Sequence, residues 1–288
     1  MGRERPRKLV CLFGSVLLSL TLLHAQPQFR LLDEPVIEKH LKEFSRDNAT
    51  RELTIRKWLS QAGCKDSNLS EESLDRKLPP NVICVVPGEM DSIIVVGAHT
   101  DHVTDFGEGV IDNWSSASLL PSLLYSLTGR LRRHTFIFVG FSAEEKGMLG
   151  STYYAQHLTA DQRSHIAAVV NMDSLGLGPT KVWASHSDTT LLRHLDAVAT
   201  TMHISVEVVN VEGVGSTDSE SFAPYNIPRI TLHSVTPETL RILHSPNDRM
   251  TTVKMSDYYD SYRLIAAYLA YLDETLKPAA TRSGQVEH

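Results

Sequence analysis

The chain has 288 residues, of which 42% are hydrophobic and 22% are charged, a composition that excludes a disordered or fibrous protein and favours a globular one. Its formal net charge of -6 and isoelectric point near 6.1 leave no basic face for nucleic acid. We therefore expect no nucleic-acid partner.

Residues 1–25 have the features of a secretory signal peptide. A basic start is followed by an apolar run from Leu9 to Leu23, and the small residue Ala25 stands where a signal peptidase would cut. A retained membrane anchor is the alternative, but a membrane span needs roughly 20 residues and this run is shorter. We expect cleavage after Ala25, a secreted or periplasmic location, and no stable membrane association afterwards.

Cysteine usage agrees with an exported protein. Removal of the signal peptide takes Cys11 away and leaves Cys64 and Cys84, an even number in an oxidising compartment. A disulfide between them is our hypothesis. Two unrelated buried thiols are the alternative that the sequence leaves open.

The pattern of apolar residues changes along the chain. Residues 34–63 have them at helical spacing, which predicts one or two amphipathic helices. Residues 65–80 are polar and end in two prolines, which is typical of a loop or a weak edge strand. Beyond them, short apolar runs cover residues 81–86, 92–98, 134–141, 166–172 and 229–232, and helical stretches cover 115–127, 148–158, 189–202 and 255–276.

Alternation of strands and helices predicts a three-layer α/β sandwich, with a mixed, largely parallel central sheet flanked by helices. No repeat or linker divides it, so we expect a single domain over residues 26–277 that includes the helices of 34–63. Residues 278–288 are small and polar, and we expect them to form a flexible tail.

Histidine or acidic residues follow the central apolar runs. Each one alone could simply cap the next helix. In open α/β sheets, however, the carboxyl ends of the strands form the ligand site, so these side chains are expected to converge. Several carboxylates in one crevice need cations, and imidazole with carboxylate suits zinc. The residues are His99, Glu144, Glu145 and Asp173 after the runs, and Asp112 in the loop before the helix of 115–127.

Four short motifs contain these residues: His-x-Asp-His at 99–102, Asp-Asn at 112–113, Glu-Glu-x-Gly-x-x-Gly-Ser at 144–151 and Asn-Met-Asp at 171–173. A fifth motif, His-x-Pro-x-Asp at 244–248, adds His244. Any one of them is weak, but the set in this order and spacing resembles the co-catalytic dizinc aminopeptidases, including bacterial secreted enzymes. That family also contains glutamate carboxypeptidase II, the glutaminyl cyclases and the transferrin receptor. The resemblance covers about residues 81–248 and leaves the N-terminal helices unassigned.

The resemblance implies a set of metal ligands. Asp112 would bridge two zinc ions, His99 and Asp173 would complete one site, and Glu145 and His244 would complete the other. The expected cofactor is therefore two Zn²⁺ per chain, although cobalt or manganese could replace zinc in the same geometry.

The resemblance also implies two supporting roles. Glu144 would act as general base on a water activated by the two zinc ions. Asp101 would orient the His99 ring through its second nitrogen. His102 lies close to the metals in sequence, and whether it supports the site or is an ordinary histidine stays open.

Three positions depart from the family pattern. Ser219 stands where the family's Ser-Asp-His stretch has histidine, so the role of that histidine does not transfer. Leu243 stands where relatives often have a tyrosine, which leaves open what polarises the scissile carbonyl. Ile111 replaces a second aspartate, so Asp112 is the one candidate for the bridging ligand.

The expected function is that of a secreted metallo-exopeptidase, most simply an aminopeptidase acting on peptide substrates. A glutaminyl-peptide cyclotransferase with one zinc is the alternative, disfavoured because those relatives usually lose the histidine that is His99 here. A non-catalytic binding module is disfavoured because the ligands and Glu144 are all present. The sequence leaves open the preferred side chain, carboxypeptidase or other amide hydrolysis, the metal loaded in the cell and the oligomeric state.

Overall fold

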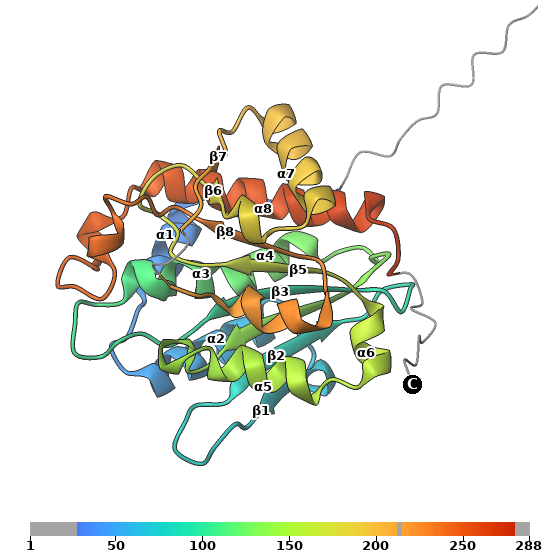
Figure 1. Ribbon diagram of the computed structural model, residues 1–288, viewed down its shortest axis with the longest axis horizontal. Helices are drawn as coiled ribbons and strands as arrows, with labels where there is room; N and C mark the ends of the chain where they lie inside the picture. The colour runs from blue at the N-terminus through green and yellow to red at the C-terminus, as the bar shows by residue number, and fades with distance from the viewer. Residues whose placement is uncertain (1–27, 212–214, 280–288) are drawn as a thin grey trace, which may run out of the picture.

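One eight-stranded sheet organises the computed structural model, which describes residues 28–211 and 215–279 (Figure 1). The strand order is β1-β2-β4-β3-β5-β8-β6-β7. The four central strands, β4, β3, β5 and β8, are parallel to one another, and the antiparallel pairs lie to either side of them. The predicted fold class is confirmed. The predicted signal peptide and residues 280–288 of the predicted tail lie outside the described residues.

The strands begin and end within one residue of the predicted apolar runs. Two further strands, β6 and β7, were not predicted, because two residues are too few to show a period. The polar segment before residue 80 contains the edge strand that was one of its two predicted forms. The strands are β1 Leu69–Glu72, β2 Asn81–Val86, β3 Ile93–His99, β4 Thr135–Phe141, β5 Ile166–Met172, β6 Lys181–Val182, β7 Glu207–Val208 and β8 Arg229–His233.

Side-chain caps mark the starts of several helices. Asp47 accepts a hydrogen bond from the backbone of Thr50 at the start of α2, and Asp188 caps α7 in the same way. Within the described ranges, no helix has both the length and the apolar character needed to cross a membrane. The helices are α1 Glu34–Lys42, α2 Asn48–Gln61, α3 Ser115–Ala117, α4 Leu119–Leu127, α5 Leu149–His157, α6 Ala160–His165, α7 Thr189–Met202 and α8 Met255–Thr275.

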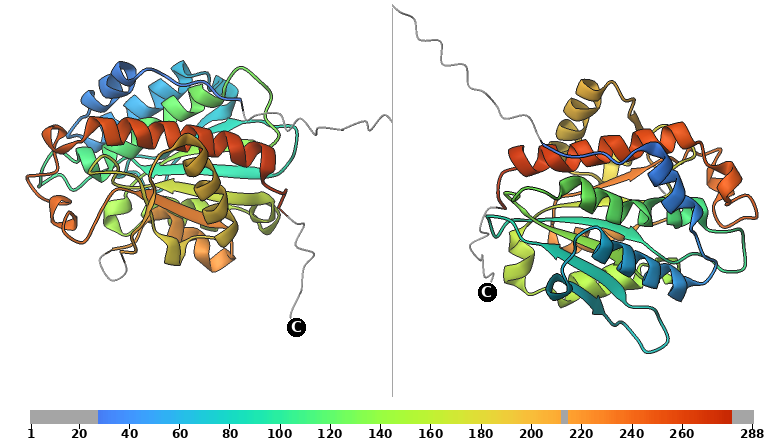
Figure 2. Two further views of the ribbon diagram at one scale, coloured as in Figure 1. Left: turned by 90° about the horizontal axis from the view of Figure 1, so that it is seen from above. Right: turned by 180° about the vertical axis from the view of Figure 1, so that it is seen from behind.

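Two apolar cores lie on opposite faces of the sheet, because successive residues of a strand point to opposite sides. Ile94 and Val96 of β3 belong to the larger core, beneath α1, α2, α4, α7 and α8. Val95 belongs to the smaller core, beneath α5 and the 3₁₀ helix η5 (Asp218–Tyr225). Figure 2 shows the long orange-red α8 and the blue N-terminal helices on the side of the larger core. The result is the predicted three-layer sandwich.

A disulfide joins Cys64, which follows α2, to Cys84 of β2. The two Cα atoms are 6.1 Å apart, and both residues are buried in the larger core. The bridge predicted from the sequence is therefore present, and it attaches the end of the N-terminal helices to the sheet.

Removing this bridge is expected to lower the free energy of unfolding by about 3 kcal/mol, because the bond closes a loop with a sequence separation of 20 in the unfolded chain. The variant Cys64→Ala/Cys84→Ala can be compared with wild type by urea denaturation. Reduced wild type serves as the control and should lose a similar amount. Equal unfolding midpoints for the double variant and oxidised wild type would contradict the prediction.

Candidate metal centre

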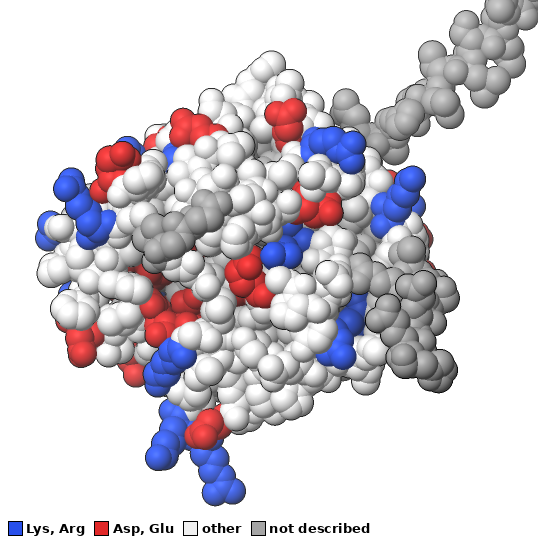
Figure 3. All heavy atoms as spheres, in the orientation of Figure 1, with Lys and Arg blue, Asp and Glu red and all other residues white. Residues whose placement is uncertain are grey.

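The predicted ligands meet at the carboxyl edge of the parallel strands. His99 is the last residue of β3, and Asp173 directly follows β5. Glu145 belongs to the short helix η3 (Glu144–Lys146), which follows β4. Asp112 lies in the irregular π-helical turn η2 (Val110–Trp114), and His244 lies in the loop after β8. All five line one cavity, and Figure 3 shows acidic side chains recessed between uncharged surface.

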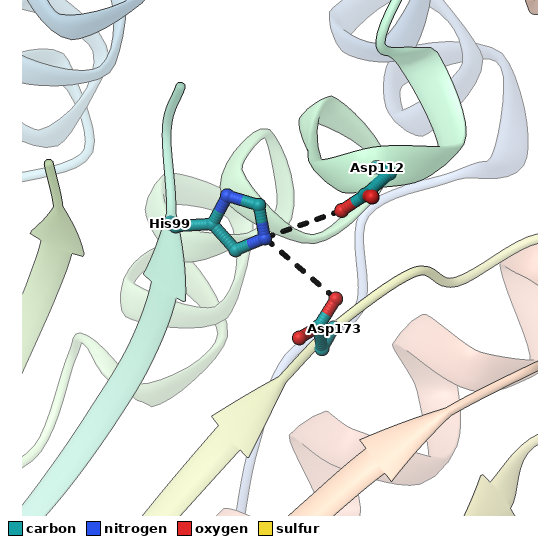
Figure 4. A group of neighbouring side chains, drawn as sticks. All are labelled: His99, Asp112 and Asp173. Carbon is teal, nitrogen blue, oxygen red and sulfur yellow. Dashed lines mark ion pairs between the residues drawn. The ribbon is translucent and has the colours of Figure 1, made fainter. Parts of the chain in front are cut away.

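His99, Asp112 and Asp173 form the first group of potential ligands. The Nε2 atom of His99 lies 3.3 Å from Oδ1 of Asp112 and 3.7 Å from Oδ1 of Asp173. Figure 4 shows the imidazole directed between the two carboxylates. The ring of His99 is only 1% exposed, so its orientation is set by packing.

Asp112, Glu145 and His244 form the second group. The Nε2 atom of His244 lies 3.1 Å from Oδ2 of Asp112 and 2.8 Å from Oε2 of Glu145. The two oxygens of Asp112 therefore face different histidines, Oδ1 toward His99 and Oδ2 toward His244. This is the arrangement that a carboxylate bridging two metal ions requires.

The spacing of these atoms fits zinc. Two ligand atoms that each lie about 2.0–2.1 Å from a tetrahedral zinc ion are about 3.3 Å from each other. The nitrogen-to-oxygen distances of the two groups run from 2.8 to 3.7 Å and bracket that value. The donor set of imidazole nitrogen and carboxylate oxygen is also one that zinc prefers.

The electrostatics of the cavity show an excess of negative charge. Hydrogen bonds that His244 donates to the carboxylates of Asp112 and Glu145 raise the pKa of His244 to about 10. Burial, with the charges of Asp218 and Asp173 adding to it and that of His99 opposing it, raises the pKa of Glu144 to about 9. Both groups therefore hold a proton more tightly than usual. Divalent cations would compensate the negative charge of the cavity more fully than these protons do, which supports the fit of the site to metal.

Asp101 supports the centre in a way that differs from the expectation. The Nδ1 atom of His99 lies 3.2 Å from the backbone oxygen of Asp101 and 3.7 Å from its carboxylate. The carboxylate instead accepts hydrogen bonds of 3.0 Å from the backbone N–H of Glu144 and 3.2 Å from that of Glu145. Asp101 therefore holds the turn that carries both glutamates, while its carbonyl faces the imidazole.

Two further side chains orient Asp173, and neither was assigned from the sequence. The hydroxyl of Thr217 donates to Oδ2 of Asp173 at 2.7 Å and accepts from the amide of Asn171 at 2.6 Å. Asn113 accepts a hydrogen bond from Ser174 N–H and donates to the carbonyl of Met172, which ties the Asp173 turn to the neighbour of Asp112. Asn171 and Asn113 belong to quoted motifs, whereas Thr217 shares no local pattern with Asp173.

The rest of the cavity is largely apolar. Its wall includes Trp183, Val235, Leu240 and Leu243. Leu243 therefore stands at the cavity without a hydrogen-bond donor in its side chain, as its residue type implied. Ser219, the other departure from the family pattern, is buried and pairs its hydroxyl with that of Thr231 at 2.8 Å.

A largely parallel sheet that brings two groups of potential metal ligands, sharing one carboxylate, to its carboxyl edge places the chain among α/β proteins with a candidate metal site. The model of Peptidase family M28 matches residues 81–269, and the chain belongs to this family. The resemblance inferred from the five motifs is thereby confirmed.

Relatives known by sequence match parts of the chain. Leupeptin-inactivating enzyme 1 of Streptomyces exfoliatus is 30% identical over 151 residues, which are 51% of this chain and 34% of that protein. An aminopeptidase of Pseudomonas aeruginosa strain UCBPP-PA14 is 34% identical over 89 residues, 31% of this chain and 16% of that protein. The matched segments thus span about a third or less of the length of these curated relatives.

Several solved structures share the fold. LapB of Legionella pneumophila has a TM-score of 0.72 at 18% identity, covering 84% of this chain and 72% of that one. BSAP, a zinc aminopeptidase from Bacillus subtilis, has a TM-score of 0.62 at 22% identity, covering 70% and 52%. A glutaminyl cyclase of Porphyromonas gingivalis has a TM-score of 0.66 at 14% identity, covering 84% and 97%. The fold is therefore common to peptidases and cyclases.

The geometry of Asp101 yields a prediction about metal affinity. The variant Asp101→Asn keeps the size of the side chain but can no longer accept both backbone hydrogen bonds with oxygen, so the Glu144–Glu145 turn should loosen. Supporting residues of this kind typically change metal affinity by about 10–100-fold. We expect a zinc dissociation constant raised within that range, measured by chelator competition. Asp105→Asn, at an exposed position of the same loop, should bind zinc like wild type; equal affinities for both variants would refute the role.

Proposed function

We propose that this chain is a zinc metallo-exopeptidase that holds two zinc ions and hydrolyses N-terminal peptide bonds, with Glu144 as general base. One observation carries the proposal: the two oxygens of Asp112 face two different histidines and so divide five ligands into two groups. Glu144 lines the same cavity but belongs to neither group. A carboxylate is thus left for proton transfer.

The metal ions would be held by His99, Asp112 and Asp173 in one site and by Asp112, Glu145 and His244 in the other. When bound, they would lower the pKa of a shared water and polarise the scissile carbonyl.

Glu144 is positioned to move protons. Its backbone N–H is bonded to Asp101, and its side chain lies in the cavity beside the ligands. Burial is the main cause of its raised pKa of about 9, and bound cations would lower that pKa toward neutral pH, where a general base works best. In the proposed reaction Glu144 takes a proton from the attacking water and delivers it to the nitrogen of the leaving amine.

Cyclisation of N-terminal glutamine is a second candidate, because a glutaminyl cyclase shares the fold. The presence of His99 within a complete ligand group favours the two-metal hydrolase over this one-zinc reaction.

We also propose export after cleavage behind Ala25, which the Cys64–Cys84 disulfide supports because such bonds persist in oxidising compartments. Mass spectrometry of the exported protein should find Gln26 first, and an intact Met1 would refute the cleavage.

Activity of the variant Glu144→Gln tests the assigned function. Loss of the base should lower kcat on aminoacyl p-nitroanilides by about 10²–10⁴-fold, while zinc content stays at the wild-type level. Glu89→Gln changes an exposed glutamate outside the cavity and should leave kcat unchanged. Acetylated substrates should not be cleaved by wild type.

Two results would contradict the proposal. Wild type that releases ammonia from glutaminyl peptides and cleaves no aminoacyl substrate would identify the cyclase instead. Full activity of Glu144→Gln would remove the base from the mechanism.

A further inference from the structure

The loop of residues 102–109 connects the two ligands His99 and Asp112, and both of its ends contact helix α2. This helix precedes residues 81–269, the part of the chain that the family model matches. The N-terminal helices, which the sequence motifs left unassigned, therefore contact the segment that delivers the shared carboxylate.

Arg51 of α2 holds the end of this loop that is nearer to Asp112. Its side chain is fully buried, and its Nη2 atom donates to the carbonyl of Glu108 at 2.6 Å and to that of Gly109 at 3.0 Å. Its Nε donates to the carbonyl of Ser45 at 2.6 Å, which fixes the guanidinium to the turn before α2. The two carbonyls that accept from Nη2 of Arg51 belong to the residues directly before η2, the turn that contains Asp112.

Asn48 holds the other end of the loop. Its amide nitrogen donates to the carbonyl of His102 at 3.2 Å, and its Oδ1 accepts from the backbone N–H of His102 at 3.2 Å and lies 2.8 Å from the ring Nδ1. The His102 side chain packs against Gly109, where a Cβ atom would lie 2.4 Å from that of His102. The two ends of the loop, His102 and Gly109, are thus in contact with each other, and both are hydrogen-bonded to α2.

Asp248 holds the same segment from the opposite direction. Its carboxylate accepts hydrogen bonds from the backbone N–H of Ile111 at 2.6 Å and of Asp112 at 3.2 Å. Trp114, at the end of η2, donates its indole N–H to the carbonyls of His40 and Leu41 at the end of α1. The turn that carries Asp112 is therefore fixed before, within and after the ligand.

Stability alone does not explain a buried arginine at this position. The Nη1 atom of Arg51 is buried and has no hydrogen-bond partner among the described residues, which destabilises the folded state. The hydrogen bonds that Arg51 does make go to main-chain carbonyls, two in the loop and that of Ser45 before α2, rather than to a carboxylate. What those bonds determine is the path of the chain into η2.

We propose that Arg51 is a positioning residue of the metal centre, which holds the loop before η2 so that both oxygens of Asp112 face the two histidines. The inference rests on the proposed function in that the positioned group is the shared metal ligand. It adds the N-terminal helices to the machinery that the family motifs define.

The variant Arg51→Lys tests this role, because lysine keeps the charge but cannot reproduce the planar fork of donors. Arg132→Lys is the matched control. Arg132 is 2% exposed and also donates to backbone carbonyls, those of Leu127 and Gln28, but it precedes β4 at the opposite edge of the sheet. Both variants should lose stability, so a difference between them isolates the position of the loop.

Two measurements separate the outcomes. In metal-free protein, hydrogen exchange at the amides of Ile111 and Asp112 should be at least about 10-fold faster in Arg51→Lys than in Arg132→Lys. The zinc dissociation constant should rise by about 10–100-fold in Arg51→Lys and stay at the wild-type value in the control. Equal exchange rates in the two variants would overturn the proposal.

The exchange measurement stands even if the proposed function fails. Wild type that binds no zinc would refute the metal centre, while the exchange rates would still decide whether Arg51 holds the loop. If Arg51→Lys does not fold, Asn48→Ala replaces it, with faster exchange expected at the His102 amide, which donates to Asn48 Oδ1. Wild-type exchange at that amide in Asn48→Ala would overturn the role of α2.

Discussion

The shared carboxylate of Asp112 is the interaction on which the rest of the site depends. Its two oxygens lie 3.3 Å and 3.1 Å from the nitrogens of His99 and His244, so a small rotation would break both groups at once. Three further carboxylates, those of Glu144, Glu145 and Asp173, line the same cavity. Their mutual repulsion is unfavourable without cations. Hydrogen bonds hold the carboxylate of Asp173 and the backbone of the Glu144–Glu145 turn in place.

Strands position some of the potential ligands, and loops position the others. The parallel strands β3, β4 and β5 deliver His99, the two glutamates and Asp173 to one edge, because parallel strands end on the same side. Loops deliver Asp112 and His244, and these need separate support. Asp101 supports the turn of the glutamates, whereas Asp248 and the N-terminal helices support the turn of Asp112. The disulfide at Cys64 attaches those helices to the sheet.

The sequence predicted much of this arrangement, for reasons that are local. Apolar runs such as 166–172 predict strands directly. Each potential ligand at a strand end could be identified because it follows such a run in the sequence. The hydrogen bonds that support the site from distant parts of the chain could not be predicted. The bond of Thr217 to Asp173 spans 44 residues, and that of Arg51 to Glu108 spans 57. The carboxylate of Asp101 was assigned to the nearby ring, from which it lies 3.7 Å, but its hydrogen bond to the turn 43 residues away was not predicted. No periodicity or motif encodes such pairings.

Anomalous diffraction at the zinc absorption edge, from crystals of the mature protein, tests the central claim most directly. The account predicts two zinc peaks in one cavity, with one oxygen of Asp112 coordinated to each, His99 and Asp173 beside the first, and Glu145 and His244 beside the second. A single peak, or two peaks that do not share Asp112, would contradict it.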